Sequence, residues 1–376
     1  MEYDIYEWQI KPRGSFMTLL ESDIVWGHII WAARYIDGEE KLKELLNEFN
    51  SGNPPFIVSN GFYTGFFPFF NKKPINRSDT DSFSEVLGIN GSEGILKTIQ
   101  ALKSIKKVKE VSVDLFEDIR EGNSSKKLLE ECFEGKRCPK CFKLLKEIGC
   151  SVSNGLNSTY KNNCKVFHVG VFPNENDKCI IEKKQEYSNP KTINETVMKN
   201  SINRLTGTTG EENSLFTQKE FYYDETKTIS IYFKIRKGYD VKKLEEYLNY
   251  IIKDGFGKRK STGKGFFESI SFNKNDKIFK TVKNPNGYIV LSNYIPSESD
   301  FTEVIGAEIM TKRGKLSGEF SGDEKPFKKP IVLYQSGSLF KGENREYHGK
   351  MLQNVHFNKE IVHYGYSFSL GVNLDE

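Results

Sequence analysis

The chain has 376 residues, a net charge of +4 and 37% hydrophobic residues, which is enough for two domains of ordinary size. Its 28 Phe and 18 Tyr residues argue against intrinsic disorder, and its charged fraction of 28% argues against a bundle of membrane helices. The N-terminus lacks the basic and apolar regions of a secretory signal. We therefore expect a cytoplasmic protein that does not contact a membrane and whose six cysteines are reduced.

The first part of the chain predicts a strand, two helical stretches, a second strand and a further helix. Residues 3–10 alternate polar and apolar side chains, as a half-buried strand does. Ser22 and Asp23 can cap a helix whose apolar residues recur every three or four positions, and another helix follows Gly38. A short strand is expected at residues 54–58 and a helix at residues 94–107.

Residues from about 120 to 195 differ in composition, because they hold all six cysteines and many Asn and Ser residues. We interpret this segment as an insertion. Two of its cysteines have the two-residue spacing of a zinc knuckle, and a tetrahedral structural zinc site is one reading. The candidate ligands are Cys138, Cys141, Cys164 and His168. Cys132 and Cys150 are rival ligands, and cysteines that bind no metal are an open alternative.

The pattern becomes regular again after the insertion. Residues 229–235 predict a strand, residues 241–252 a helix with one apolar face, and residues 266–272 a strand. Further strands are expected within 287–292, 330–334 and 361–372. The fold class that accounts for this order is α+β, with two tandem ferredoxin-like (RRM-like) domains. Residues 1–215, with the insertion, would form the first domain and residues 216–376 the second.

A basic glycine-rich loop lies between the helix and the strand of that unit. Residues 255–265, GFGKRKSTGKG, contain four glycines, four cationic residues and no carboxylate. Glycines allow positive φ and close approach of a ligand, while backbone N–H groups, hydroxyls and cations suit phosphate groups. The spacing and the order helix, loop, strand do not fit a nucleotide-binding P-loop. A solvated surface turn is the alternative to a nucleic-acid contact.

Several blocks of sequence together resemble a known family. They are residues 19–46, 200–216, 255–267 and 285–296, and a tail that includes GSLF, GKMLQNVHF and VHYGYSFSLGV. In this order they resemble the subunit of the type III-A CRISPR effector (Csm) complex that caps the 5′ end of the CRISPR RNA, a member of the RAMP superfamily. The resemblance covers nearly the whole chain outside the insertion.

The resemblance implies a tandem ferredoxin-like fold and a non-catalytic, RNA-binding role that requires no cofactor. The chain would hold the 5′ repeat-derived tag of the CRISPR RNA and would contact two protein partners, the large polymerase-like subunit and a backbone RAMP subunit. The residues expected at the RNA are Ser22, His28, Asn200, Arg204, Thr206, Gly207, Gly257, Lys258, Arg259, Lys260, Ser261, Gly263 and Lys264. Tyr364 and Tyr366 could stack on bases or could form one face of a strand.

Two other functions remain open at this point. Relatives in the superfamily process CRISPR RNA without a metal, and His28 could act as the general base with Arg204 stabilising the developing charge. However, His28 shares a helix face with Ile24 and Trp31, where a packed histidine is common. A protein-interaction scaffold whose basic loop merely faces solvent is the third reading.

Overall fold

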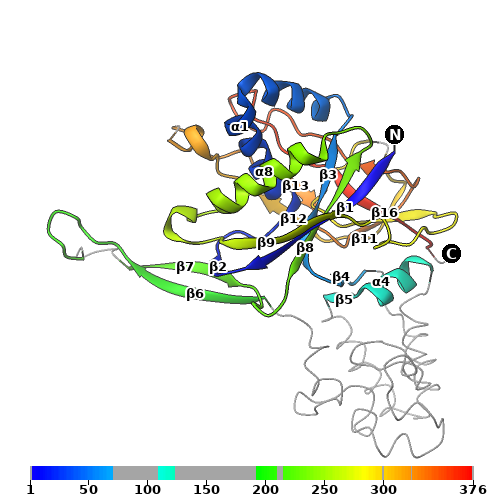
Figure 1. Cartoon of the computed structure of the whole chain (residues 1–376), viewed down its shortest axis with the longest axis horizontal. Helices are drawn as coiled ribbons and strands as arrows, with labels where there is room; N and C mark the ends of the chain where they lie inside the picture. Colours follow the sequence, from blue (N-terminus) through cyan, green and yellow to red (C-terminus); the bar gives the residue numbers. More distant parts are fainter. Residues whose placement is uncertain are drawn as a thin grey trace, which may run out of the picture.

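The computed structural model describes residues 2–70, 109–122, 192–209, 215–298, 300–322 and 324–374. The six cysteines, His168 and the helix expected at residues 94–107 lie outside these ranges. The described chain is mixed α+β, and two antiparallel sheets form its body (Figure 1). None of the described helices has the length and apolar character needed to span a bilayer.

The first sheet has the connectivity of a ferredoxin-like domain. Its strand order is β3-β8-β1-β9 and all neighbours are antiparallel. Helix α1 connects β1 to β3, and helix α8 connects β8 to β9, which gives the order βαββαβ. The elements are β1 (Tyr3–Pro12), α1 (Ser22–Asn50), β3 (Phe56–Tyr63), β8 (Ile229–Arg236), α8 (Val241–Asp254) and β9 (Phe267–Lys274).

This pairing differs from the two domains expected at residues 1–215 and 216–376. The predicted strand, helix and strand at β8, α8 and β9 are present, but they complete the sheet that β1 begins. A boundary after residue 215 would therefore divide the first sheet. Periodicity identified each element, whereas it contains no information about which strands pair.

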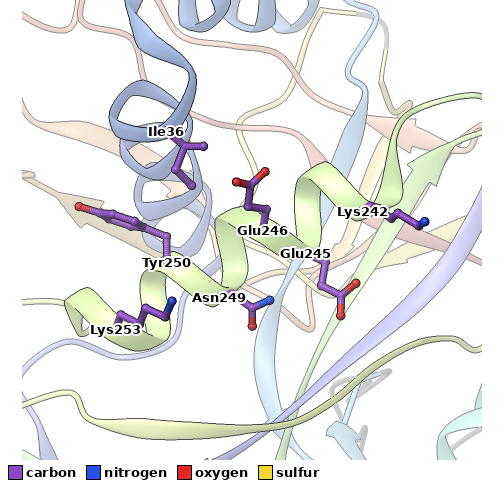
Figure 2. A pocket seen from close by; sticks show the side chains of 7 residues that line it. All are labelled: Ile36, Lys242, Glu245, Glu246, Asn249, Tyr250 and Lys253. Carbon is purple, nitrogen blue, oxygen red and sulfur yellow. The ribbon is translucent and has the colours of Figure 1, made fainter.

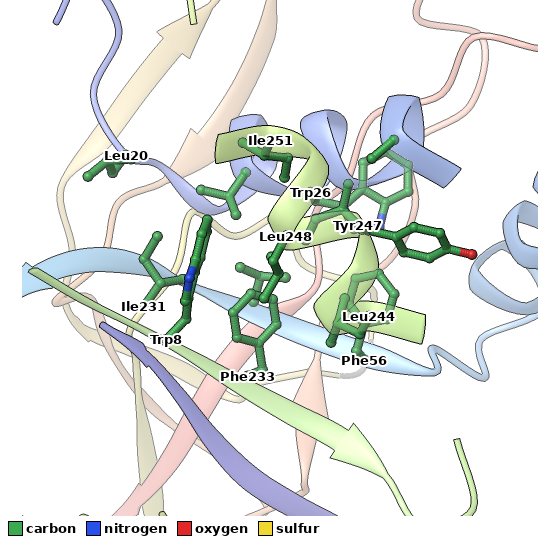
Figure 3. Close-up of a cluster of buried hydrophobic side chains, with 14 of the residues drawn as sticks. Trp8, Leu20, Trp26, Phe56, Ile231, Phe233, Leu244, Tyr247, Leu248 and Ile251 are labelled. Carbon is green, nitrogen blue, oxygen red and sulfur yellow. The ribbon is translucent and has the colours of Figure 1, made fainter. Parts of the chain in front are cut away.

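Both helices cover one face of the first sheet. Trp8 and Phe233 point from the sheet into a core that also contains Trp26, Leu244 and Leu248 of the helices (Figure 3). Full burial of side chains of this size stabilises the fold by roughly 1.5–3 kcal/mol each. Helix α1 changes direction at Gly38, where φ is 84°, so the expected break between two helical stretches is confirmed.

The second sheet packs on the opposite face of the first. Its strand order is β11-β14-β10-β16-β15, and Ile289 and Phe368 of this sheet share a cluster with Ile57 and Tyr232 of the first. β8 is therefore buried on both faces, which explains its nearly continuous apolar sequence. The strands are β10 (Gly287–Val290), β11 (Glu303–Gly306), β14 (Leu339–Lys341), β15 (Tyr347–His348) and β16 (Ser367–Val372).

No α-helix occurs within the described residues from 275 to 374, so the structure does not show a second ferredoxin-like domain there. A helix that precedes the insertion, α4 (Val113–Arg120), packs against the second sheet instead. Arg120 donates from Nε to the Gly371 carbonyl at 3.1 Å and forms a buried pair with Glu117, with both Nη1–O distances below 2.9 Å. Strands β4 (Phe66–Pro68) and β5 (Glu110–Ser112) pair beside this helix.

Two hairpins extend from this body. Strands β6 (Ile193–Asn200) and β7 (Leu215–Tyr222) form a long hairpin that projects away from the two sheets and is joined to them through β2 (Ser15–Phe16) (Figure 1). Strands β12 (Ile309–Lys312) and β13 (Ile331–Tyr334) form a second, shorter hairpin. A 3-10 turn, η4 (Gly318–Gly322), lies between β12 and β13 in the sequence.

Buried polar contacts connect the start of α1 to the C-terminal part of the chain. The backbone N–H of Asn293 donates to Ser22 Oγ at 3.0 Å, and Lys312 Nζ lies 2.8 and 2.7 Å from the two carboxylate oxygens of Asp23. Ser22 and Asp23 were expected to cap the helix. The N-cap is Glu21, which makes no side-chain capping bond, so these residues instead join α1 to β12 and to the segment after β10.

We predict that Lys312→Met destabilises the protein by about 3–5 kcal/mol, because it leaves the Asp23 carboxylate buried without its cation. Asp23→Asn combined with Lys312→Met should cost less than Lys312→Met alone. Urea unfolding followed by circular dichroism measures both. Lys41→Ala is the control, because Lys41 forms an exposed pair with Glu44 and should change stability by less than about 1 kcal/mol. Equal effects of Lys41→Ala and Lys312→Met would contradict the prediction.

Candidate nucleic-acid interface

The glycine-rich loop leaves α8 and enters β9 through an unusual backbone path. Five of its residues, Gly255, Gly257, Arg259, Gly263 and Gly265, have positive φ. At Gly257 an added Cβ would lie 2.7 Å from Thr18 Cβ, and at Gly265 it would lie 1.9 Å from the Phe256 carbonyl oxygen. These two glycines are required by close contacts, so the glycine content of the loop has a packing cause as well as a conformational one.

Several backbone N–H groups of the loop are already used within the chain. Gly257 donates to His28 Nε2 at 3.0 Å, Lys258 donates to Thr18 Oγ1 at 3.1 Å, and Gly265 donates to the Ser15 carbonyl at 2.9 Å. These bonds attach the loop to β2, to α1 and to the segment between them. The N–H groups of Lys260 and Ser261 lie in the first turn of the 3-10 helix η3 (Lys260–Thr262), the end of a helix at which backbone N–H groups can meet an anion.

The four cations of the loop divide into two pairs with different surroundings. Lys258 and Arg259 are exposed and form no ion pair within the described chain. Lys260 instead pairs with Asp254 at the end of α8. Lys264 Nζ lies 2.7 Å from both Ser15 Oγ and Glu220 Oε2, which connects the loop to β7. Two of the four expected phosphate ligands are therefore free, and two hold the loop in place.

The Lys264–Glu220 contact is a strong local electrostatic interaction. Glu220 has a nearly completely buried side chain, and the hydrogen bond from Lys264 is the largest cause that lowers the pKa of Glu220 to about 2. Lys199 of β6 lies 3.7 Å from the other carboxylate oxygen. This carboxylate therefore joins the loop to the base of the β6–β7 hairpin.

His28 lies under the loop and is engaged as an acceptor. Its ring is 4.7 Å from that of Phe256, and burial, followed by the positive charge of Lys260, lowers the pKa of His28 to about 4. The ring is therefore neutral at pH 7, and the Gly257 N–H occupies the Nε2 lone pair. This arrangement makes His28 a support for the loop and gives no support to its role as the general base of a ribonuclease.

Ser22 does not lie at the surface. Its side chain is completely buried and bonded to Asn293, so a direct contact with RNA at this residue is contradicted. Tyr364 and Tyr366 are also buried, with 1% and 2% of their surface exposed. Their hydroxyls bond to the Val58 N–H and the Phe49 carbonyl, so neither ring is available for stacking on a base.

Asn200, Arg204, Thr206 and Gly207 lie at or near the end of the projecting hairpin and are all exposed. Gly207 adopts a φ of 67° and donates its N–H to the Asn203 carbonyl at 2.8 Å, which closes the turn. The base of the hairpin adjoins the glycine-rich loop through Glu220, whereas the turn projects away from the body (Figure 1). The structure thus brings the loop together with the root of the hairpin rather than with Arg204.

Exposed apolar side chains on this hairpin escaped the sequence analysis. Leu205 is 97% exposed, and Met198, Leu215 and Phe216 are also on the surface. The only signal for this surface would have been a strand without a buried face. β6 is such a strand, because none of its residues is buried.

A shallow pocket of about 450 Å³ lies on the outer side of α8, where Ile36 of α1 approaches (Figure 2). Its lining carries both charges, with Lys242 and Lys253 beside Glu245 and Glu246. None of the predicted RNA-binding residues contributes to it. The described part of the chain contains no group of three or more His, Cys, Asp or Glu side chains that could hold a metal ion.

The geometry defines a class of protein: a ferredoxin-like sheet with a basic, glycine-rich loop after its second helix and a second sheet on its free face. No protein-family model and no curated protein matches the sequence. Solved structures do match the fold. A chain in the crystal structure of the Csm3–Csm4 subcomplex in the type III-A CRISPR-Cas interference complex superposes with a TM-score of 0.57 and 12% identity, over 98% of this chain and 99% of that one.

A chain in the crystal structure of the Csm1–Csm4 cassette in complex with cA4 superposes with a TM-score of 0.50 and 15% identity, over 99% of both chains. The chain therefore has the fold of a subunit of Csm complexes, along nearly its whole length. This agrees with the resemblance of the sequence to a Csm-complex subunit, whereas the second ferredoxin-like domain that the resemblance implied is not shown in the described residues. At these identities the likeness extends to the fold alone.

The two loop glycines with different surroundings provide a matched test of the loop geometry. Gly265→Ala should destabilise the protein more than Gly263→Ala, because the new Cβ meets backbone at position 265 and open space at position 263. Both have positive φ, which alone costs roughly 1–2 kcal/mol. Urea unfolding of the two variants measures the difference, and equal losses of stability would show that the loop backbone is not packed as described.

Stability should also depend on pH through three buried histidines. Burial is the main cause that lowers the pKa of His28, His348 and His363 to about 4. The unfolded chain protonates histidine near pH 6.5, so stability is complete above that pH and falls toward pH 4, by up to about 1.4 kcal/mol per pH unit for each histidine. NMR titration of the ring Cε1–H signals checks this, and midpoints near 6.5 for these three rings would contradict it.

Proposed function

We propose that this chain is a non-catalytic RNA-binding subunit of a type III-A CRISPR interference complex, and that it holds the 5′ repeat-derived tag of the CRISPR RNA. The observation that carries the proposal is the pair of unpaired, exposed cations Lys258 and Arg259 on a loop whose shape is fixed from below. A fixed loop loses little conformational entropy on binding, and free cations can replace the counterions of a phosphate backbone. The fold of a Csm-complex subunit supports this role.

Ser261, Gly257 and Gly263 would lie at the same phosphates, with the N–H groups of Lys260 and Ser261 as further donors. Lys260 could exchange its pairing with Asp254 for a phosphate, because both side chains are partly exposed. Lys264 would act by holding the loop rather than by touching RNA. Asn200, Arg204, Thr206 and Gly207 would meet a part of the RNA that passes along the hairpin.

The partners follow the same reasoning. The matching structures contain Csm4 with Csm1 and Csm4 with Csm3. We extend this to the present chain and propose that it docks a large polymerase-like subunit and a backbone RAMP subunit, in the cytoplasm. The exposed apolar side chains of the β6–β7 hairpin are surfaces that such contacts could cover.

No cofactor is needed for this role. A structural zinc ion held by Cys138, Cys141, Cys164 and His168 remains a proposal, since these residues lie outside the described chain. Four protein ligands would leave no open position on the metal, so the ion would stabilise the insertion and not perform chemistry. Measurement of the zinc content of the purified protein, before and after Cys138→Ser with Cys141→Ser, tests this point.

Replacing Lys258 and Arg259 together by Ala should weaken binding to RNA that carries the tag. The slope of log affinity against log salt should decrease by about one unit or less for each phosphate contact that is lost. Fluorescence anisotropy titrations at several salt concentrations, with tagged and untagged CRISPR RNA, measure both effects. Gel analysis of the RNA afterwards shows whether it stays intact.

The matched control is Lys41→Ala with Lys43→Ala, which removes the same charge from the exposed C-terminal half of α1. This control should leave the affinity for tagged RNA nearly unchanged. An equal loss of affinity in both double variants would show that the loop contributes only through the net charge of the protein. Cleavage of the RNA by the unmodified chain, together with loss of that cleavage in His28→Ala, would instead establish the ribonuclease alternative.

A further inference from the structure

A second basic surface lies far from the glycine-rich loop in sequence, beyond the ends of β12 and β13. The two segments continue side by side after the strands end, because Leu316 N–H donates to the Pro326 carbonyl at 2.7 Å and Lys328 N–H donates to the Gly314 carbonyl at 2.8 Å. Lys315 and Phe327 are bridge partners across this extension. In such a pairing, alternate side chains share one face.

The outward face of this extension carries cations and aromatic rings. Alternate residues are buried or partly buried, among them Lys312, Leu316 and Lys328, while their neighbours are exposed. On this face the exposed residues are Arg313, Lys315, Lys325, Phe327 and Lys329, and Phe357 adjoins them; Glu324, next to Lys325, is also exposed. We call the four cations and two phenylalanines of this set the extension patch. No carboxylate in the described chain forms an ion pair with any of its four cations.

The two phenyl rings of the extension patch are on the surface and are each approached by a cation. The Arg313 guanidinium lies 5.3 Å from the centre of the Phe327 ring, and Lys325 Nζ lies 4.1 Å from that of Phe357. Phe327 is 45% exposed and Phe357 is 68% exposed. Burial in the core therefore does not explain either ring.

The extension patch rests on a rigid support. The segment that carries Phe357 is held by the Lys329 N–H, which donates to the Val355 carbonyl at 2.7 Å, and by His356 Nε2, which lies 2.7 Å from the Lys325 carbonyl. Lys312, which precedes Arg313, is fixed by its contacts with Asp23. A surface whose backbone is already ordered loses little entropy when a ligand binds.

Unpaired cations interleaved with exposed aromatic rings are the composition that binds single-stranded nucleic acid, in which phosphates pair with cations and bases stack on rings. We propose that the extension patch binds a single-stranded RNA segment, with Phe327 and Phe357 as stacking platforms and with Arg313, Lys315, Lys325 and Lys329 as phosphate ligands. A protein partner would need a dense acidic surface and would gain less from the two exposed rings. The proposal concerns a second RNA contact and does not rest on recognition of the tag by the glycine-rich loop.

The test uses the full chain with Lys258→Ala and Arg259→Ala already introduced, so that the loop does not dominate, and a labelled single-stranded oligouridine without a tag. Phe327→Ala with Phe357→Ala should weaken binding roughly 5- to 150-fold for each base that loses its stacking partner. Arg313→Ala with Lys315→Ala should reduce the salt slope by about 0.7 units per lost phosphate contact, the value for a single strand. Phe327→Trp with Phe357→Trp should retain the affinity, because the ring surface remains.

The control is Ile309→Ala with Val332→Ala, which removes two exposed apolar side chains from the same hairpin but no ring and no charge. These variants should bind oligouridine as the parent does. Equal affinity of the Phe327→Ala, Phe357→Ala variant and its parent would overturn the proposal. Unchanged RNA binding together with lost assembly of the protein complex would assign the extension patch to a protein partner and would overturn it as well.

Discussion

The contact between Asp23 and Lys312 is the constraint that fixes the start of α1 against the β12–β13 hairpin. Burying two opposite charges is unfavourable unless their geometry and remaining hydrogen bonds compensate for lost hydration. Asp23 meets this condition, because its carboxylate accepts from Lys312 and from Asn293 Nδ2 at 3.0 Å. Burial alone would raise the pKa of Asp23, but Lys312 lowers it, so the pair stays charged. The paired charges therefore hold the start of α1 against β12.

Contacts within the chain also determine the position of the glycine-rich loop. Its composition suggests a flexible basic segment, yet His28, Thr18 and Ser15 each accept from its backbone, and Lys264 ends on a buried carboxylate. These contacts maintain the fold, and they leave Lys258 and Arg259 as the two loop cations that form no ion pair within the described chain. The charge of a residue is therefore a weaker guide to ligand binding than its contacts within the chain, because a cation that is already paired is less available to a ligand.

The sequence predicted elements better than it predicted their partners. The strand, helix and strand at β8, α8 and β9 and the break at Gly38 follow from periodicity and from the conformational freedom of glycine. The assignment of β8 to a second domain failed because strand pairing is non-local, and the insertion separates β8 from β1 in the chain. The candidate site shows the same limit. Ser22 has the residue type of a helix cap and also that of a buried hydrogen-bond partner, and only the fold distinguishes them.

The pairing of β1 with β8 has a consequence for the order in which the chain can fold. Glu7 and Ser230 bond across these two central strands although 223 positions separate them in the sequence. During synthesis the N-terminal strand and α1 must therefore wait, with an apolar face uncovered, until more than half of the chain has been made. Contacts of such separation slow folding, and the waiting segment is exposed to aggregation. The long insertion thus sets a delay, and early binding of a chaperone or of a neighbouring subunit would shorten the time for which Trp8 and Trp26 meet water.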